Sequence, residues 1–143
     1  MKKFDLSKYL GIWYEIARTP NRFEFDMENV KTQYSLNSDG SISIINYGDT
    51  VFGLRKFSGI ARTTKDDLVL DVSFFPGISS EYKILFVDDY YQVALVKGGD
   101  DLFWILSREP KLDWELLEKL IILARLNGCD IKSLILTPQN KQE

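Results

Sequence analysis

Few side chains in this sequence could act as catalysts. The 143 residues include no histidine, which is the commonest general base and the commonest metal ligand in proteins. A serine triad, a zinc hydrolase or a two-histidine iron site therefore cannot be assembled. Glu15 and Cys129 remain as candidates for acid–base or nucleophilic chemistry, although we expect Cys129 to be a small buried hydrophobic residue. The composition thus predicts a protein that is not an enzyme and that uses no metal or cofactor.

The net charge and the hydropathy pattern limit the partners of the chain. A formal net charge of −3 provides no basic surface for a nucleic-acid backbone, so we expect no nucleic-acid partner. No run approaches the roughly 20 apolar residues that a membrane-spanning helix needs. The two lysines near the start precede no apolar segment, so we identify no secretory signal. The sequence as written predicts a cytoplasmic protein, or one of the cell envelope if a leader was removed.

Short runs of β-branched and aromatic residues, separated by turn residues, predict eight strands. Their spacing of about 8–12 residues is typical of an all-β sandwich or barrel. Short connections make neighbouring strands antiparallel, and closing the sheet removes its edges. About eight strands leave an interior just wide enough for one small ligand. The predicted strands span residues 11–17, 30–36, 42–47, 55–63, 68–75, 82–87, 91–96 and 102–106.

The C-terminal third changes to a helical period. Apolar residues recur at helical spacing over residues 114–127, after a possible N-cap at Asp113 and before a stop at Gly128. A helix does not fit inside a small barrel, so we expect it to pack on the outer wall. A short ninth strand is predicted over residues 131–136. We interpret residues 1–143 as one domain whose barrel spans about 11–107.

Three short motifs support this interpretation by resemblance. Gly11-x-Trp13 stands at the start of the first strand, Asp88 precedes Tyr91 by three residues, and Arg108 follows the eighth strand. The order and placement of these motifs resemble those of the lipocalins. Longer strings at residues 9–18 and 104–110 are similar to the bacterial outer-membrane lipocalins and to apolipoprotein D.

The resemblance implies an eight-stranded antiparallel up-and-down lipocalin barrel with a C-terminal α-helix packed outside and a short ninth strand. It implies that Trp13 and Arg108 meet at the closed end, where a cation–π contact is worth about 0.5–2 kcal/mol. We assign Gly11, Asp88 and Tyr91 to the fold as well. The relatives carry a lipid-modified cysteine before the barrel, which this sequence lacks, so membrane anchoring is not carried over.

The same resemblance suggests which residues line a ligand cavity. It indicates Tyr34, Asn46, Tyr82 and Trp104, and strand alternation adds apolar walls at Leu36, Ile44, Ile84 and Leu102. The alternative is that these side chains simply fill a packed core. If Trp13 faces inward, alternation also turns Glu15 and Ala17 inward. We expect a Tyr hydroxyl or an Arg to satisfy Glu15 in that position.

The predicted function is the binding, storage or transport of a small hydrophobic ligand, and we expect a fatty acid or lysophospholipid. Four basic residues could meet its headgroup near the mouth, although a solvated surface is the commoner role: Arg18, Arg22, Arg55 and Lys56. Phe23 and Phe25 follow the first strand and could form a lid, a dimer contact or a peripheral membrane contact. A barrel-filled protein-interaction module and an isomerase or hydrolase using Glu15 or Cys129 remain alternatives, and either a monomer or a homodimer is compatible with the sequence.

Overall fold

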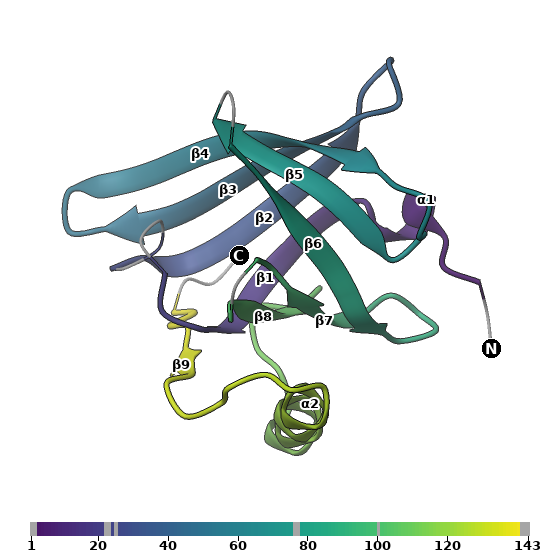
Figure 1. The fold of residues 1–143 in the computed structure, drawn as a ribbon. Coiled ribbons are helices and arrows are strands. Elements are labelled where there is room, and N and C mark those ends of the chain that lie inside the picture. Colours follow the sequence, from purple (N-terminus) through teal and green to yellow (C-terminus); the bar gives the residue numbers. More distant parts are fainter. Residues whose placement is uncertain (1–2, 22–23, 25, 76–77, 100, 141–143) are drawn as a thin grey trace.

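A single antiparallel sheet closes into a barrel (Figure 1). The computed structural model describes residues 3–21, 24, 26–75, 78–99 and 101–140. Strands β2 to β8 pair in chain order, β8 pairs with β1, and β1 returns to β2 to complete the closure. This confirms the predicted eight-stranded barrel with an outer helix and an extra strand. The elements are α1 (Leu6–Tyr9), β1 (Gly11–Arg18), β2 (Glu28–Leu36), β3 (Ile42–Thr50), β4 (Gly53–Thr63), β5 (Val69–Phe75), β6 (Ile78–Val87), β7 (Val93–Lys97), β8 (Phe103–Ser107), α2 (Trp114–Leu126) and β9 (Ile135–Leu136).

The short helix α1 lies at the end of the barrel where β1 begins (Figure 1). The Arg108 guanidinium carbon stands 3.8 Å from the centroid of the Trp13 ring, and the guanidinium donates hydrogen bonds to four backbone carbonyls around it. Those carbonyls belong to α1 and its C-cap residue, to β1 and to the turn before β7: Lys8, Leu10, Ile12 and Tyr91. One side chain therefore ties three separate segments together at this end.

The other motif residues shape the backbone around this contact. Gly11 has a φ of +102°, a conformation that residues with a Cβ rarely adopt, and an added Cβ would stand 3.4 Å from the Arg108 side chain. Asp88 Oδ1 accepts from the backbone N–H groups of Gln92 and Val93, which orders the turn between β6 and β7. The Tyr91 hydroxyl accepts from the backbone N–H of Asp5, which holds the N-terminal segment against the barrel.

A β-bulge interrupts the alternation of β1. The register against β8 shifts between Glu15 and Ala17, so Ile16 and Ala17 both belong to the outer apolar cluster. The expectation that Ala17 faces inward is therefore wrong. After the bulge, Arg18 lies on the inner side beside Glu15, with a distance of 2.9 Å between Nη1 and Oε2. Without the extra residue, positions 15 and 18 would point to opposite faces.

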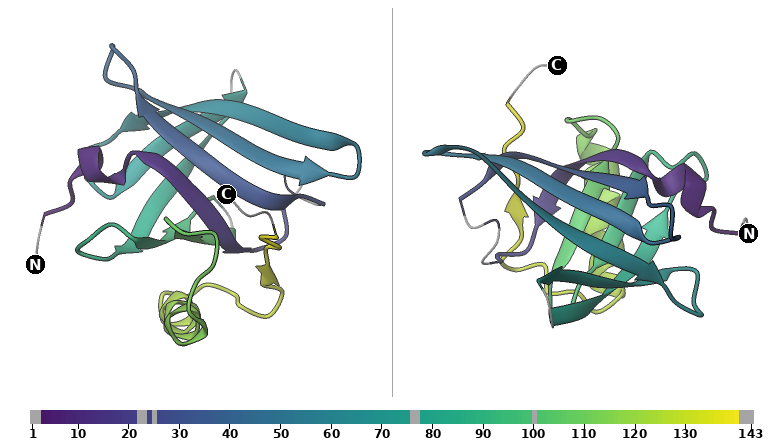
Figure 2. Two further views of the ribbon diagram at one scale, coloured as in Figure 1. Left: turned by 180° about the vertical axis from the view of Figure 1, so that it is seen from behind. Right: turned by 90° about the horizontal axis from the view of Figure 1, so that it is seen from above.

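Helix α2 packs on the outer wall of the barrel (Figure 2). Leu117, Leu120 and Ala124 are buried in a cluster with apolar residues of β1, β7 and β8. The side chain of Asp113 makes no capping hydrogen bond, so the predicted N-cap interaction is absent. The helix ends at Leu126, and Gly128 follows with a φ of +84°.

The C-terminal segment completes the seam between β1 and β2. Strand β9 is only two residues long, shorter than the predicted 131–136, because the chain forms a turn up to Leu134 and pairs with β1 only afterwards. β1 and β2 pair only as far as Tyr14 and Lys31. Beyond this point Gln139 Nε2 donates to the carbonyls of Glu15 and Val30, 2.8 Å from each, and bridges the two strands.

The Arg108 contacts lead to a prediction about stability. Arg108→Ala removes the donor of four backbone carbonyls and the stacking partner of Trp13, so we expect the free energy of unfolding to fall by about 2–4 kcal/mol. Urea denaturation measures this change. Arg125→Ala, at an exposed position of α2, is the control and should change stability by less than about 0.5 kcal/mol. Equal stability of the two variants would show that the contacts at the closed end contribute little.

Candidate functional site

The barrel encloses a cavity of about 460 Å³. This volume lies within the range of about 300–1,000 Å³ that is usual for small-molecule sites. Asn21, Gly98 and Gly99 are in its wall, so the cavity reaches the end of the barrel opposite α1. Its surface is largely apolar, with a small number of polar groups. Six of the eight residues predicted to line it do so: Tyr34, Ile44, Asn46, Tyr82, Leu102 and Trp104.

The other two predicted wall residues lie elsewhere. Leu36 is 59% exposed. It is the last residue of β2 and lies two residues past Tyr34, which pairs with Gly11 at the start of β1, so no residue of β1 lies beside it. Ile84 is 1% exposed and packs in the core cluster, one alternation nearer the closed end than Tyr82. Strand alternation indicates the direction of a side chain but not its depth along the barrel. The placement of Leu36 and Ile84 in the cavity wall is therefore wrong.

Three tyrosine hydroxyls meet at the inner end of the cavity. Tyr82 shares hydrogen bonds with Tyr34, at 2.8 Å, and with Tyr9 from α1. Burial raises the pKa of Tyr34 to about 12 and raises the pKa values of Tyr9 and Tyr82 well above the usual range. All three phenols therefore keep their protons at neutral pH, and this end of the cavity is polar but uncharged.

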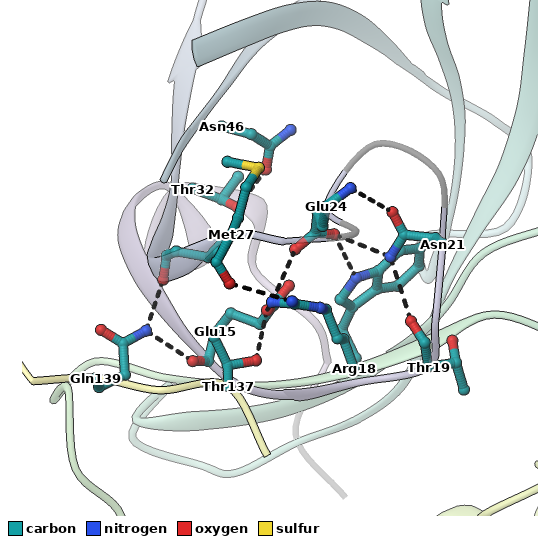
Figure 3. A network of polar contacts seen from close by, with 12 residues as sticks. Glu15, Arg18, Thr19, Asn21, Glu24, Met27, Thr32, Asn46, Thr137 and Gln139 are labelled. Atoms are coloured by element: carbon teal, nitrogen blue, oxygen red, sulfur yellow. Dashed lines mark hydrogen bonds and ion pairs between the residues drawn. The ribbon is translucent and has the colours of Figure 1, made fainter. Parts of the chain in front are cut away.

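A buried ion pair stands between the cavity and the seam of the barrel (Figure 3). Glu15 and Arg18 are almost completely buried, and Glu15 Oε2 also accepts a hydrogen bond from the hydroxyl of Thr137. Arg18 Nη2 donates to the backbone carbonyl of Met27 at 3.1 Å. Of the two partners expected for Glu15, an Arg is present, and a Thr hydroxyl replaces the Tyr hydroxyl.

A second carboxylate, Glu24, approaches the same guanidinium from the loop after β1. Its Oε1 accepts hydrogen bonds from the indole N–H of Trp104 at 2.9 Å and from the Asn21 amide at 3.3 Å. Its Oε2 stands 4.0 Å from Arg18 Nη1, and both Glu24 and Glu15 lie in the cavity wall. The side chain of Glu24 is thus tied to β8 at the mouth of the barrel.

Two carboxyl groups share one guanidinium in this network. The pKa of Glu15 lies well above its usual range, because burial disfavours the charged form and because Glu24 places a second acidic group beside it. The hydrogen bond from Thr137 and the positive charge of Arg18 lower the pKa of Glu15, but their effect is smaller. A proton retained by Glu15 can be donated to Glu24, which relieves the repulsion between the two carboxyl groups.

The remaining candidate residues lie away from the cavity or outside the described chain. Arg18 is bound to Glu15 and Met27, and Arg55 and Lys56 are exposed on β4 and are not part of the wall. Arg22, Phe23 and Phe25 fall outside the described residues. Cys129 is buried in the cluster beneath α2, where burial raises the pKa of its thiol. Cys129 therefore lies outside the barrel and contributes no nucleophile to the cavity.

The described part of the chain contains no group of three or more His, Cys, Asp or Glu side chains placed to hold a metal ion. None of the helices there combines the length and apolar character that crossing a membrane requires.

Sequence reasoning missed Tyr9 and Glu24. Tyr9 lies in a helix outside the strand pattern, and its partner Tyr82 is 73 residues away. Glu24 is hydrogen-bonded to Trp104, which lies 80 residues later in the sequence. The only local signal for Glu24 was its place between two phenylalanines in a polar loop.

A closed up-and-down barrel with an outer helix and a ligand-sized cavity defines the class of small-molecule-binding β-barrels. A family profile described as a lipocalin-like domain matches residues 4–139, and the chain belongs to the lipocalin family, whose members bind small hydrophobic ligands. It is 38% identical over 144 residues to the outer membrane lipoprotein Blc of Citrobacter freundii, covering 97% of this chain and 81% of that protein.

Other relatives agree with this assignment. Mouse apolipoprotein D is 32% identical over 153 residues, covering 96% of this chain and 78% of the relative. The predicted resemblance to bacterial outer-membrane lipocalins and apolipoprotein D is confirmed. Among solved structures, apocrustacyanin C2 superposes with a TM-score of 0.80 at 21% identity, covering 96% of this chain and 81% of that chain, which supports the fold alone.

The carboxyl pair leads to a prediction about pH. Because the pKa of Glu15 is raised on folding, the folded state holds a proton that the unfolded state loses above about pH 4.5. The contribution of Glu15 to stability therefore falls as the pH rises from about 4.5 to its raised pKa. Glu24→Gln removes the acidic neighbour but keeps an oxygen for Trp104, so we expect a shallower fall.

Urea denaturation of the wild type and Glu24→Gln between pH 5 and pH 8 measures this difference. The control is Asp26→Asn, an exposed carboxylate in the same loop, which should follow the wild type. Parallel stability curves for the wild type and Glu24→Gln would refute the coupling between the two carboxyl groups.

Proposed function

We propose that this lipocalin binds and carries a single-chain lipid, a fatty acid or a lysophospholipid, and catalyses no reaction. The observation that carries the proposal is the cavity of about 460 Å³ inside the closed barrel, with tyrosines at one end and polar groups at the other. A cavity closed at one end suits a molecule with one apolar chain and one polar end. The chain lies in the barrel and the headgroup stays near the mouth.

The apolar wall provides the affinity in this proposal. Ile44, Val72, Val96 and Leu106 surround the space between the two polar ends. Burying an alkyl chain there contributes about 0.8 kcal/mol for each methylene group. A long chain therefore binds without an ion pair, which is consistent with a wall in which no described residue is basic.

The two alternative functions are less well supported. A barrel filled by its own side chains would leave no volume of this size for a ligand. An isomerase or hydrolase would need a reactive group free to act. Glu15 is engaged by Arg18 and Thr137, and Cys129 lies outside the barrel.

Native mass spectrometry of protein purified without detergent, followed by lipid extraction, tests the proposal. We expect one lipid per barrel. Ile44→Trp fills the cavity and should lower the bound fraction at least tenfold, whereas Ile45→Trp, at the neighbouring position that is not part of the cavity wall, is the matched control. Wild-type protein that carries no lipid and takes up none would refute lipid carriage.

The β3–β4 hairpin provides a surface for exchange of such a ligand. Its tip exposes three apolar side chains, Val51, Phe52 and Leu54, at 87%, 95% and 69%. The tip lies at the same end of the barrel as the cavity mouth, and Arg55 and Lys56 follow it along β4. Apolar side chains beside basic ones suit contact with an anionic lipid surface. We propose that this tip touches the membrane while the ligand enters or leaves.

The hairpin tip can be tested with vesicles. Phe52→Asp places a charge at the centre of the apolar tip, so we expect binding to vesicles that contain anionic lipid to fall at least fivefold in a flotation assay. Leu36→Asp changes an exposed apolar residue at the opposite end and should leave binding unaltered. Equal vesicle binding of the two variants would contradict membrane contact through the tip. If the wild type is a dimer and Phe52→Asp is a monomer, the tip is instead a contact between two copies of the chain.

A further inference from the structure

The charged residues in the cavity wall are all acidic in the part of the chain that the structure describes. They are Glu15, Glu24 and Glu81, and no described Lys or Arg is part of the wall. Among the described residues, the basic group next to these carboxylates is Arg18, which is held by Glu15 and by the Met27 carbonyl. When these carboxyl groups are ionised, the described residues of the mouth carry more negative charge than positive charge, in a region where water screens charges weakly.

One oxygen of Glu24 lacks a hydrogen-bond donor among the described residues when Glu15 is ionised. The side chain is only 9% exposed, and its Oε1 accepts from Trp104 and Asn21, but among the described residues Oε2 has no hydrogen-bond partner once Glu15 has lost its proton. Arg18 does not fill this role, because its Nη1 is 4.0 Å away and is hydrogen-bonded to Glu15. A buried charged acceptor without a donor is costly, so the structure leaves a place for a group that brings an N–H bond or a positive charge.

We propose that the mouth of this cavity recognises a primary ammonium headgroup through Glu24, with Glu15 beside it, while the apolar chain of the same molecule fills the barrel. The preferred ligands are therefore single-chain lipids with a free amine, either simple amines or zwitterions such as ethanolamine lysophospholipids. This inference rests on the proposed carriage of a lipid and specifies its headgroup.

The charge balance supports an ammonium group. The two carboxylates of Glu15 and Glu24 and the guanidinium of Arg18 sum to one negative charge when no proton is bound. An ammonium group brings one positive charge and three N–H donors, so it neutralises the network and supplies the donor that Glu24 Oε2 lacks. A fatty-acid carboxylate would instead add a negative charge and no donor. An alcohol brings one donor and no charge, and it should bind with intermediate affinity.

The pH dependence of binding distinguishes an ammonium group from other donors. The groups that face Glu24 are Glu15 and Arg18 from β1, Asn21 from its own loop and Trp104 from β8. At low pH a proton occupies the carboxyl pair and competes with the ammonium group. The affinity for an amine should therefore increase as the pH rises through the raised pKa of Glu15.

Three probes with the same chain and different headgroups test this inference: hexadecylamine, hexadecanol and hexadecanoate. Their affinities for lipid-free protein are measured at pH 7 from the change in tryptophan fluorescence, since Trp104 is the one of the three tryptophans that lines the cavity. We expect the amine to bind at least tenfold more tightly than the carboxylate, with the alcohol between them. Between pH 5 and pH 7.5 the affinity for the amine should rise.

Glu24→Gln is the decisive variant, since it keeps the size of the side chain and an oxygen for Trp104. It should reduce the preference for the amine to less than twofold and abolish its pH dependence, while hexadecanol binding shows that the cavity is intact. Asp26→Asn, an exposed carboxylate of the same loop, is the matched control and should keep the wild-type preference.

The outcomes separate the two proposals. If the wild type binds all three probes equally, or the carboxylate most tightly, lipid carriage stands and the ammonium inference is overturned. The inference is also overturned if Glu24→Gln keeps the preference for the amine. If none of the probes binds, lipid carriage itself fails and the inference fails with it.

Discussion

The Arg108 guanidinium holds the closed end of the barrel together, and the shape of the cavity depends on it. An eight-stranded barrel is a tube unless one end is blocked, and a short helix of four residues has too little surface to remain there alone. Arg108 solves this problem by donating to carbonyls of α1 and β1 while it stacks on Trp13. With α1 fixed, Tyr9 reaches Tyr82, and the tyrosine hydroxyls form the uncharged inner end of the cavity.

The other end of the cavity depends on an irregularity in the backbone. The bulge in β1 brings Arg18 to the same side as Glu15, and the C-terminal segment then supplies Thr137 and Gln139 where β1 and β2 no longer pair. A buried ion pair loses much of its hydration energy, so it stabilises a protein only when further hydrogen bonds surround it. The Met27 carbonyl provides one such bond for Arg18, and Thr137, 122 residues from Glu15 in the sequence, provides the other. The same C-terminal segment therefore bridges the seam of the barrel and binds the buried carboxylate near its mouth.

Much of the fold could be predicted from the sequence because it rests on local patterns. Period-two strands, turn residues and a change to helical period indicated the barrel and the outer helix. The wrong placements of side chains have two causes: a single extra residue breaks the alternation of a strand, and alternation does not give the depth of a side chain along the barrel axis. The bulge moved Ala17 outward, and alternation did not show that Leu36 lies past the end of the wall or that Ile84 lies below the cavity. Tyr9 and Glu24 could not be found, because their roles come from contacts across more than 70 residues.

The two parts of the cavity contribute differently to recognition. The apolar wall favours any alkyl chain by about 0.8 kcal/mol for each methylene, so it gives affinity without choosing a headgroup. Selectivity is the difference between the binding free energies of two ligands. Acidic residues at the mouth would increase this difference in two ways, by repelling anionic headgroups and by attracting cationic ones. The position of Glu24 matters here as well, because its hydrogen bond with Trp104 ties its side chain to β8. A headgroup that binds Glu24 would therefore meet a carboxyl group that Trp104 already holds in place, so little side-chain entropy is lost on binding.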